Sequence, residues 1–193
     1  MSDKTFRAAR KAALFVSALV GSLILVGPTA ADAFKLESSL IAPNATIAND
    51  QVFNGFDCTG KNVSPPLQWS GAPGATKSFA VTVYDPDART GAGWWHWVVY
   101  DIPASVTALA AGAGGAGGKL PPGAVQGRTD FGSAAYGGPC PPRGDKPHHY
   151  VFTVYALKTE RLDVAADASP AVIGSSISAG MIASATFTAL YGR

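Results

Sequence analysis

The sequence predicts a mainly β protein of antiparallel strands, and three observations lead to this fold class. Short segments rich in aromatic and β-branched residues recur along the chain. Turn-forming residues separate them, with 22 glycines and 14 prolines among 193 residues. Only one segment begins with residues that start a helix.

Residues 1–33 are predicted to form a secretory signal peptide. An apolar stretch from Ala12 to Val26 follows a basic N-terminal region and precedes the small residues Ala31-Asp-Ala33. This stretch of about 15 residues is short for a transmembrane helix, and an uncleaved anchor is the alternative. We therefore expect one mature domain over residues 34–193, periplasmic or secreted, with no stable membrane insertion.

The mature chain is formally neutral, because the signal segment carries four of the 15 basic residues and two of the 13 acidic ones. Nucleic-acid binding needs Lys and Arg clustered on one face, and the sequence has no such cluster. We therefore expect no nucleic-acid partner.

Three segments are predicted to be the central strands. In residues 78–84, every second residue from Phe79 to Val83 is large and apolar. Residues 95–102 and 150–157 carry aromatic and β-branched residues on both faces, as strands buried on two sides do.

The rest of the mature chain predicts one helix, one further strand and one loop. Ser169 as N-cap and Pro170 at the first helical position predict a helix ending near Ile182. Period-two alternation then predicts a last strand over residues 183–191. Residues 110–118 are entirely Ala and Gly and cannot bury enough apolar area to offset their ordering entropy. We expect them to form a mobile surface loop.

The two cysteines, Cys58 and Cys140, are predicted to be bonded to each other, because an exported protein meets an oxidising compartment. Such a disulfide would stabilise the fold by roughly 4–5 kcal/mol in the chain-entropy model. Two separate buried thiols are the alternative.

Two pairs of sequence blocks hold all three histidines: Tyr84-Asp-Pro-Asp-Ala88 with Trp94-Trp-His-Trp97, and Gly137-Gly-Pro-Cys-Pro-Pro-Arg143 with His148-His-Tyr150. Residues two apart on a strand share a face, so Trp94 points with His96, and His148 with Tyr150. One small polar pocket could hold all four side chains.

Catalysis in this pocket is the weaker interpretation. The sequence has no Gly-x-Ser-x-Gly nucleophile elbow, and Cys140 is expected to lie in a disulfide. A triad of an unusual serine with His96 or His148 and Asp85 or Asp87 stays an alternative. The three histidines and two carboxylates lack a recognised metal-ligand spacing, so we expect no metal and no cofactor.

Ligand binding explains the same residue types better. Imidazole, Tyr hydroxyl and backbone N–H groups can donate to a phosphate or carboxylate, while Asp85 would hold an ammonium or hydroxyl group and Trp94 would cover the ligand. These groups suit a zwitterionic head group or a phosphomonoester. The alternative is that Asp85 only organises a turn before Pro86. Because imidazole protonates near neutral pH, we expect tighter anion binding at about pH 6 than at about pH 8.

These blocks resemble the phosphatidylethanolamine-binding protein family, especially its bacterial Raf-kinase-inhibitor-like branch. Two further segments fit the same family: Asn62-Val-Ser-Pro-Pro66 and Val125-Gln-Gly-Arg-Thr-Asp-Phe131. The resemblance runs from about Phe34 to Tyr191. It implies an antiparallel β-sandwich with Greek-key connections, one or two short peripheral helices and a small anion-binding pocket at one end.

The resemblance also implies roles for single residues. Asp87 matches a second aspartate that supports a pocket loop. The positions that match the family's ligand-binding residues are Asp85, Trp94, His96, Gly138, Pro142, His148 and Tyr150.

Two departures from the family pattern concern the pocket. Arg89 stands where the family usually has proline, and its charge either attracts anionic ligands or is solvated at the surface. Eukaryotic members carry a C-terminal segment beside the pocket, whereas this sequence ends at Arg193. We therefore expect a more open pocket.

These observations together predict an exported binding protein that is not an enzyme. It would take a small phosphate-bearing or zwitterionic molecule and could regulate or inhibit a protein partner. One alternative is a protein-interaction module that does not use the pocket and that inhibits a protease or kinase or binds a host protein. The other is a hydrolase or lyase that uses the pocket. Kinase inhibition, known among eukaryotic relatives, is not expected of an exported protein.

Overall fold

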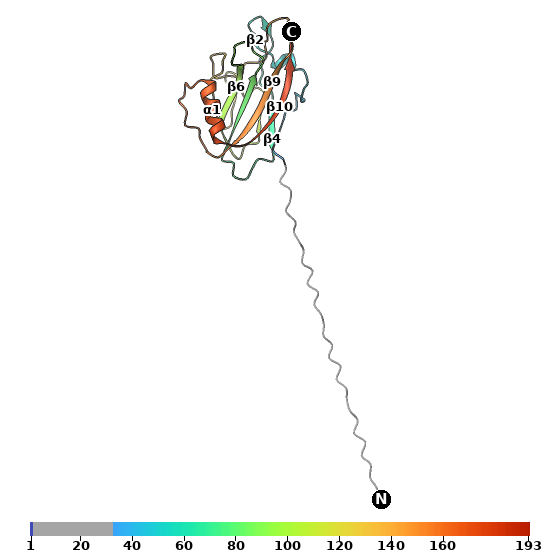
Figure 1. Ribbon diagram of the computed structural model, residues 1–193, viewed down its shortest axis with the longest axis vertical. Coiled ribbons are helices and arrows are strands. Elements are labelled where there is room, and N and C mark those ends of the chain that lie inside the picture. The colour runs from blue at the N-terminus through green and yellow to red at the C-terminus, as the bar shows by residue number, and fades with distance from the viewer. Residues whose placement is uncertain (2–32) are drawn as a thin grey trace. The chain divides into compact units, whose positions relative to one another are not determined.

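Antiparallel strands make up most of the regular structure in the computed structural model, which describes Met1 and residues 33–193 (Figure 1). The strands are β1 (Lys35–Glu37), β2 (Asn54–Gly55), β3 (Cys58–Thr59), β4 (Leu67–Ser70), β5 (Ser78–Asp85), β6 (Trp94–Pro103), β7 (Ala108–Leu109), β8 (Val125–Gln126), β9 (His148–Leu157) and β10 (Met181–Tyr191). The helices are the 3-10 helix η1 (Asn49–Gln51) and the α-helix α1 (Pro170–Gly180).

The strands form three sheets, with the orders β10-β9-β5-β6-β8, β1-β4-β7 and β2-β3. Every strand pair within these sheets is antiparallel. The predicted mainly β, antiparallel fold is confirmed, while the Greek-key connectivity stays a prediction. The predicted signal peptide lies outside the described residues, apart from Met1 and Ala33. Within the described part of the chain, no helix is long and apolar enough to cross a bilayer.

The large sheet brings three strand ends together. Its inner strands β5, β6 and β9 contain the three segments predicted to be central. Tyr84 of β5 pairs with Trp95 of β6 and with Val151 of β9. Because β6 and β9 both run antiparallel to β5, the end of β5 and the starts of its two neighbours lie at the same end of the sheet. Asp85 and His148 are terminal residues there.

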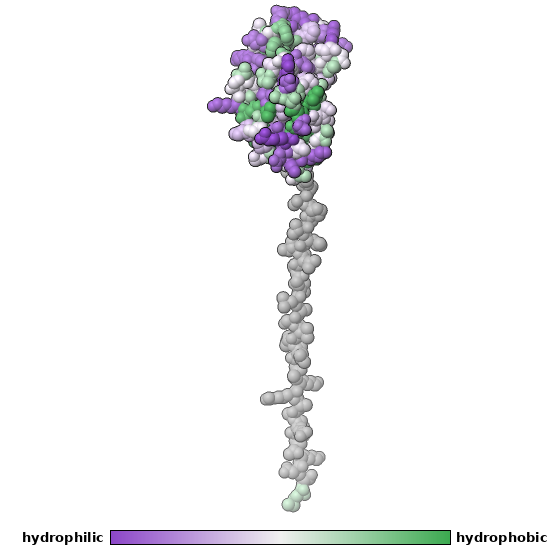
Figure 2. All heavy atoms as spheres, turned by 90° about the vertical axis from the view of Figure 1, so that its left-hand side faces the viewer, coloured by the Kyte–Doolittle hydropathy of each residue, from purple (hydrophilic) through white to green (hydrophobic). Residues whose placement is uncertain are grey.

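Side chains pack on both faces of the large sheet. On one face, Trp69 of β4 and Phe152 of β9 belong to a single buried cluster that joins the large sheet to the sheet β1-β4-β7. On the other face lies α1 (Figure 1), and its Ile173 and Ile177 pack with Val98 of β6. Full burial of such a side chain stabilises the fold by roughly 1.5–3 kcal/mol. The exposed surface on the α1 side intersperses apolar with polar residues (Figure 2).

The helix begins where the sequence predicts. The Ser169 hydroxyl accepts a hydrogen bond from the Val172 N–H at 3.3 Å, and Pro170 occupies the first turn. The helix ends at Gly180, slightly earlier than predicted, because β10 begins directly at Met181, which pairs with Leu157 of β9. The predicted last strand is therefore confirmed and longer than expected.

The prediction of a surface loop over residues 110–118 is wrong for the middle of the segment. Gly114 is buried against the Trp97 indole. Its N–H donates to the Ser64 hydroxyl at 2.9 Å, and its carbonyl accepts from the Tyr136 N–H at 2.7 Å. The missing side chain lets the backbone lie directly on an aromatic ring, so ring burial and these hydrogen bonds offset the ordering entropy.

Substitution of Gly114 by Ala should therefore destabilise the fold. The added Cβ would lie 2.5 Å from atoms of the Trp97 indole, and such overpacking costs typically about 1–3 kcal/mol. Urea unfolding should show a lower midpoint. Gly74→Ala is the control, because a Cβ there meets nothing within 4 Å. Equal midpoints for the two variants would contradict the packing described.

Candidate functional site

A cavity of about 290 Å³ lies at the end of the large sheet where β5 ends and β6 and β9 begin. Its walls come from these strand ends, the loop before β9 and the β2–β3 turn. The lining residues are Phe56, Asp85, Ala88, Arg89, Thr90, Trp94, His96, Phe131, Cys140, Pro141, Pro142, His148 and Tyr150. Every predicted ligand-binding residue except Gly138 lines this cavity.

Strand periodicity explains why four of these side chains converge. Trp94 and His96 are two apart on β6, and His148 and Tyr150 are two apart on β9. All four line the one cavity. The His96 and Tyr150 rings meet edge to face, with centroids 5.1 Å apart.

Asp85 is almost fully buried, and protein donors occupy both of its carboxylate oxygens. Oδ1 accepts from the backbone N–H groups of Asp87 at 2.8 Å and Ala88 at 3.1 Å. Oδ2 lies 2.7 Å from Nδ1 of His148. The carboxylate therefore fixes the turn after β5 and the start of β9, and it has little capacity left for a ligand.

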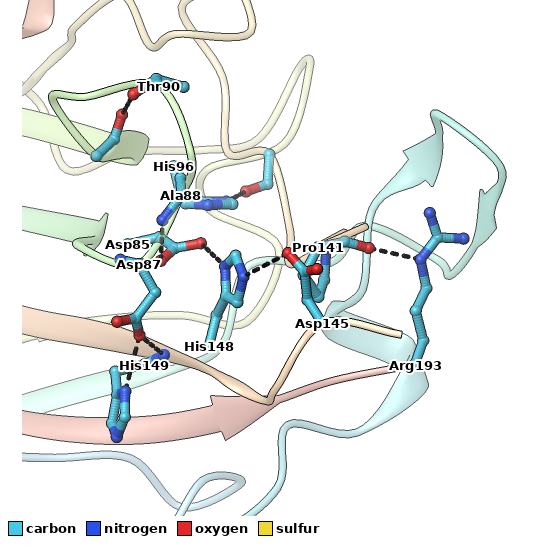
Figure 3. Close-up of polar contacts among 12 residues, drawn as sticks. Asp85, Asp87, Ala88, Thr90, His96, Pro141, Asp145, His148, His149 and Arg193 are labelled. Atoms are coloured by element: carbon cyan, nitrogen blue, oxygen red, sulfur yellow. Dashed lines mark hydrogen bonds and ion pairs between the residues drawn. The ribbon is translucent and has the colours of Figure 1, made fainter. Parts of the chain in front are cut away.

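His148 lies between two carboxylates (Figure 3). While Nδ1 faces Asp85, Nε2 lies 3.5 Å from Oδ2 of Asp145, whose other oxygen pairs with the guanidinium of Arg89. Both ring nitrogens thus face protein acidic groups. The role of His148 as a ligand contact stays a prediction, and Arg89, 74% exposed, pairs with Asp145.

His96 has a defined tautomer. Its Nδ1 lies 2.6 Å from the Gly137 carbonyl, and a carbonyl can only accept, so Nδ1 carries the hydrogen. Burial lowers the pKa of His96 to about 4, which leaves the ring neutral near pH 6. The other nitrogen, Nε2, is then a lone-pair acceptor. His96 cannot supply the positive charge that we expected of the pocket near pH 6.

The Tyr150 hydroxyl is the second polar group not used by the fold. Tyr150 is 1% exposed, and within residues 33–193 its hydroxyl has no hydrogen-bond partner. Burial raises its pKa, so the hydroxyl keeps its proton and can donate. A buried hydroxyl without a partner is costly, which makes this group a candidate ligand contact.

The wall formed by the loop before β9 is held by contacts that the sequence did not reveal. Gly138, predicted to bind ligand, instead donates its N–H to Asn62 Oδ1 at 2.7 Å, and a Cβ on it would lie 2.0 Å from the Gln51 carbonyl. The predicted disulfide between Cys58 and Cys140 is present and ties the loop to β3. The only indication in the sequence that Asn62 has a role at the site was its place in a block that resembles the family.

Arg193 adds a further link to this wall. Its Nε donates to the Pro141 carbonyl at 2.7 Å (Figure 3), and a terminal guanidinium nitrogen donates to the Asp57 carbonyl at 2.7 Å. The side chain therefore joins the cavity wall to the β2–β3 turn. No residue pattern in the sequence pointed to this contact.

Aromatic rings also line the cavity. Trp94 meets Phe131 edge to face at 5.5 Å, and Phe56 stacks on Phe131 with centroids 6.1 Å apart. Phe56 is 69% exposed and has a left-handed backbone with φ of 50°, which is unusual for a bulky residue. Neither phenylalanine was among the predicted site residues. The cavity thus combines an apolar wall with a few polar groups, as small-molecule sites do.

Asp87 occupies the supporting position that the family resemblance implies. Its Oδ2 accepts from the backbone N–H and from Nδ1 of His149, each at 2.7 Å (Figure 3). Burial works to raise the pKa of Asp87, but the bonds from His149 outweigh it and lower that pKa. This exposed pair ties the turn after β5 to β9 from outside the cavity.

No metal centre is evident in the described residues, where no three His, Cys, Asp or Glu side chains are grouped to hold an ion. Among the groups that line the cavity, His96 supplies an acceptor and Tyr150 a donor beside the aromatic rings. This arrangement can orient a small polar molecule that carries both a donor and an acceptor.

The lowered pKa of His96 predicts how stability depends on pH. The unfolded chain takes up a proton at about pH 6.5, whereas the folded protein does so only at about pH 4. The stability that comes from a neutral His96 is therefore complete above about pH 6.5 and is lost as the pH falls toward about 4. The loss is on the order of 3 kcal/mol, at about 1.4 kcal/mol per pK unit.

Urea unfolding across this pH range should show that loss in the wild type and not in His96→Asn, which keeps a donor for the Gly137 carbonyl. Parallel curves for wild type and His96→Asn would contradict the assignment of a neutral ring.

The chain is similar in sequence to known proteins. Residues 37–192 match the family model described as phosphatidylethanolamine-binding protein. The UPF0098 protein YbcL of Escherichia coli strain K12 is 56% identical over 162 residues, covering 83% of this chain and 88% of YbcL. YbhB of the same organism is 46% identical over 157 residues, 81% of this chain and 99% of YbhB. A Mycobacterium tuberculosis protein named as a lipoprotein, LppC, is 40% identical over 129 residues, 66% of this chain and 57% of LppC.

The fold is similar as well. The crystal structure of Escherichia coli YbcL, described as a member of the mammalian PEBP family, superimposes with a TM-score of 0.81 at 55% identity. The match covers 83% of this chain and 98% of that one. Sequence, fold and the residues that line the cavity lead to one conclusion: the chain belongs to the phosphatidylethanolamine-binding protein family.

Proposed function

We propose that this protein is a binding protein and not an enzyme, and that its cavity holds a small phosphate-bearing or zwitterionic head group. One observation carries the proposal: Tyr150, whose buried hydroxyl has no partner in the described residues, lines the same cavity as His96, whose Nδ1 is already bonded to Gly137. Asp85 is bonded to the turn after β5 and to His148, so the Tyr150 hydroxyl and the His96 ring are the buried groups that we expect to contact a ligand.

The cavity suits a head group in size and composition. A volume of about 290 Å³ is at the lower end of the range for small-molecule sites. Tyr150 can donate to a phosphate oxygen, and His96 can accept from a hydroxyl or ammonium group. Trp94 and Phe131 offer ring faces and edges to the apolar or cationic part of the ligand.

The polar groups of the cavity also argue against nucleophilic catalysis. Among the lining residues, Cys140 lies in the disulfide, and the Thr90 hydroxyl donates to the Gly93 carbonyl at 2.6 Å. A nucleophile would need a free hydroxyl or thiol in contact with a base. Tyr150 has a raised pKa and is a poor nucleophile, so hydrogen bonding is the role that these side chains favour.

Export to the periplasm or the exterior is part of the proposal. It rests on the predicted signal peptide and is supported by the name of LppC, a lipoprotein. The family match carries no information on a protein target. The alternative function is regulation or inhibition of a protein partner through a surface other than the cavity. A partner that still binds after pocket residues are substituted would identify this function.

Titration with phosphate and with phosphoethanolamine, followed by two-dimensional NMR, tests the proposal. We expect shifts around Asp85, His96 and Tyr150 at millimolar ligand. Tyr150→Phe should weaken binding by about tenfold or more, because a hydrogen bond to a charged group contributes about 1.5–3 kcal/mol. Tyr155→Phe is the matched control on the same strand, with its hydroxyl near Thr82 and outside the cavity lining.

Two results would contradict the proposal: no shifts at millimolar ligand, or equal affinities for Tyr150→Phe and Tyr155→Phe. Turnover of a phosphate ester that is lost in His96→Asn would favour the hydrolase instead.

A further inference from the structure

We propose that the cavity selects oxyanions that carry a proton, so that it binds phosphate and phosphomonoesters and discriminates against sulfate. The proposal rests on the proposed function and specifies which oxyanions the site accepts. The residue that determines this specificity is His96, through the Nε2 lone pair that faces the cavity.

The first step of the argument is the direction of the His96 hydrogen bonds. Because Nδ1 donates to the Gly137 carbonyl at 2.6 Å, a neutral ring can only accept at Nε2. His96 is 3% exposed, so the ring is largely shielded from bulk water. A ligand oxygen that lies there must therefore bring its own hydrogen.

The second step is the charge around the ring. Asp85 and Asp130 both act on His96 as negative charges, while Tyr150, His148 and the surface residue Arg89 are the other titratable groups at the cavity. An unprotonated oxyanion would face the His96 lone pair and the Asp85 carboxylate. Repulsion and an unmade hydrogen bond then both oppose binding.

The third step is how the fold uses the polar groups near the cavity. Asp145 engages Arg89, and His148 directs both nitrogens at carboxylates. Among the side chains that line the cavity, Tyr150 has a buried donor without a partner in the described residues, and this hydroxyl can serve one ligand oxygen. One donor next to one acceptor matches a tetrahedral group with a bare oxygen and a hydroxyl, and the two rings are 5.1 Å apart, near enough to meet one small ligand.

Phosphate and sulfate at about pH 8 provide the test, because both are then mainly dianions of similar size and only phosphate keeps a proton. We expect calorimetric or NMR titrations to show phosphate binding at least about tenfold tighter than sulfate. A single pH is used, so titration of the surrounding groups does not enter the comparison.

Two variants separate specificity from affinity. His96→Asn keeps a donor for the Gly137 carbonyl, and its shorter side chain has no group at the place of Nε2, so phosphate affinity should fall to about that of sulfate. Tyr150→Phe removes a donor that serves any oxyanion, so both affinities should fall and the phosphate-to-sulfate ratio should stay near the wild-type value.

Two phosphate esters of equal charge test the selectivity on the wild-type protein alone. At about pH 5.5, methyl phosphate is mainly a protonated monoanion, whereas dimethyl phosphate is a monoanion without a proton. We expect the first to bind wild-type protein and the second to bind at least about tenfold more weakly.

Equal affinity for phosphate and sulfate, or for the two methyl esters, would overturn the proposed selectivity. It would not contradict the proposal that the cavity binds anions. No binding of any phosphate compound would overturn the proposed function, and the selectivity with it.

Discussion

The cavity depends first on the Asp85 carboxylate. It is the last residue of β5, and its two oxygens bind the backbone of the following turn and the ring of His148 at the start of β9. One buried charge thereby fixes two neighbouring chain segments that lie more than sixty residues apart. Removal of one partner of such a buried pair leaves the other without compensation, so the geometry of the site and the stability of this end of the sheet are linked.

The protonation of the His96 ring nitrogens depends on the position of the loop before β9. Asn62 and the disulfide at Cys140 hold that loop, and Gly138 allows it to approach the Gln51 backbone closely. The Gly137 carbonyl is then placed against the His96 ring. A backbone carbonyl therefore decides which nitrogen of the ring carries the hydrogen. The hydrogen-bonding character of the site follows from the path of a loop.

Strand periodicity was sufficient to predict which side chains meet. The alternation along β6 and β9 placed Trp94 with His96 and His148 with Tyr150, because a strand of known register leaves little choice of face. The predicted disulfide followed from composition and compartment alone. Both predictions depend on local properties of the chain, which a single sequence contains.

The predictions that differ from the structure depend on contacts between distant segments. The charge expected of His96 is absent because burial and the Gly137 carbonyl act together. Gly114 looked like part of a solvated loop, yet it packs on Trp97 because a bare backbone fits there. Such contacts leave no periodic or compositional signal.

The central claim is that His96 presents a lone pair to the cavity, and the ¹⁵N chemical shifts of its two ring nitrogens test this most directly. At neutral pH we expect a protonated Nδ1 and an unprotonated Nε2. A proton on Nε2, either in the other tautomer or in an imidazolium ring, would contradict the account of the site.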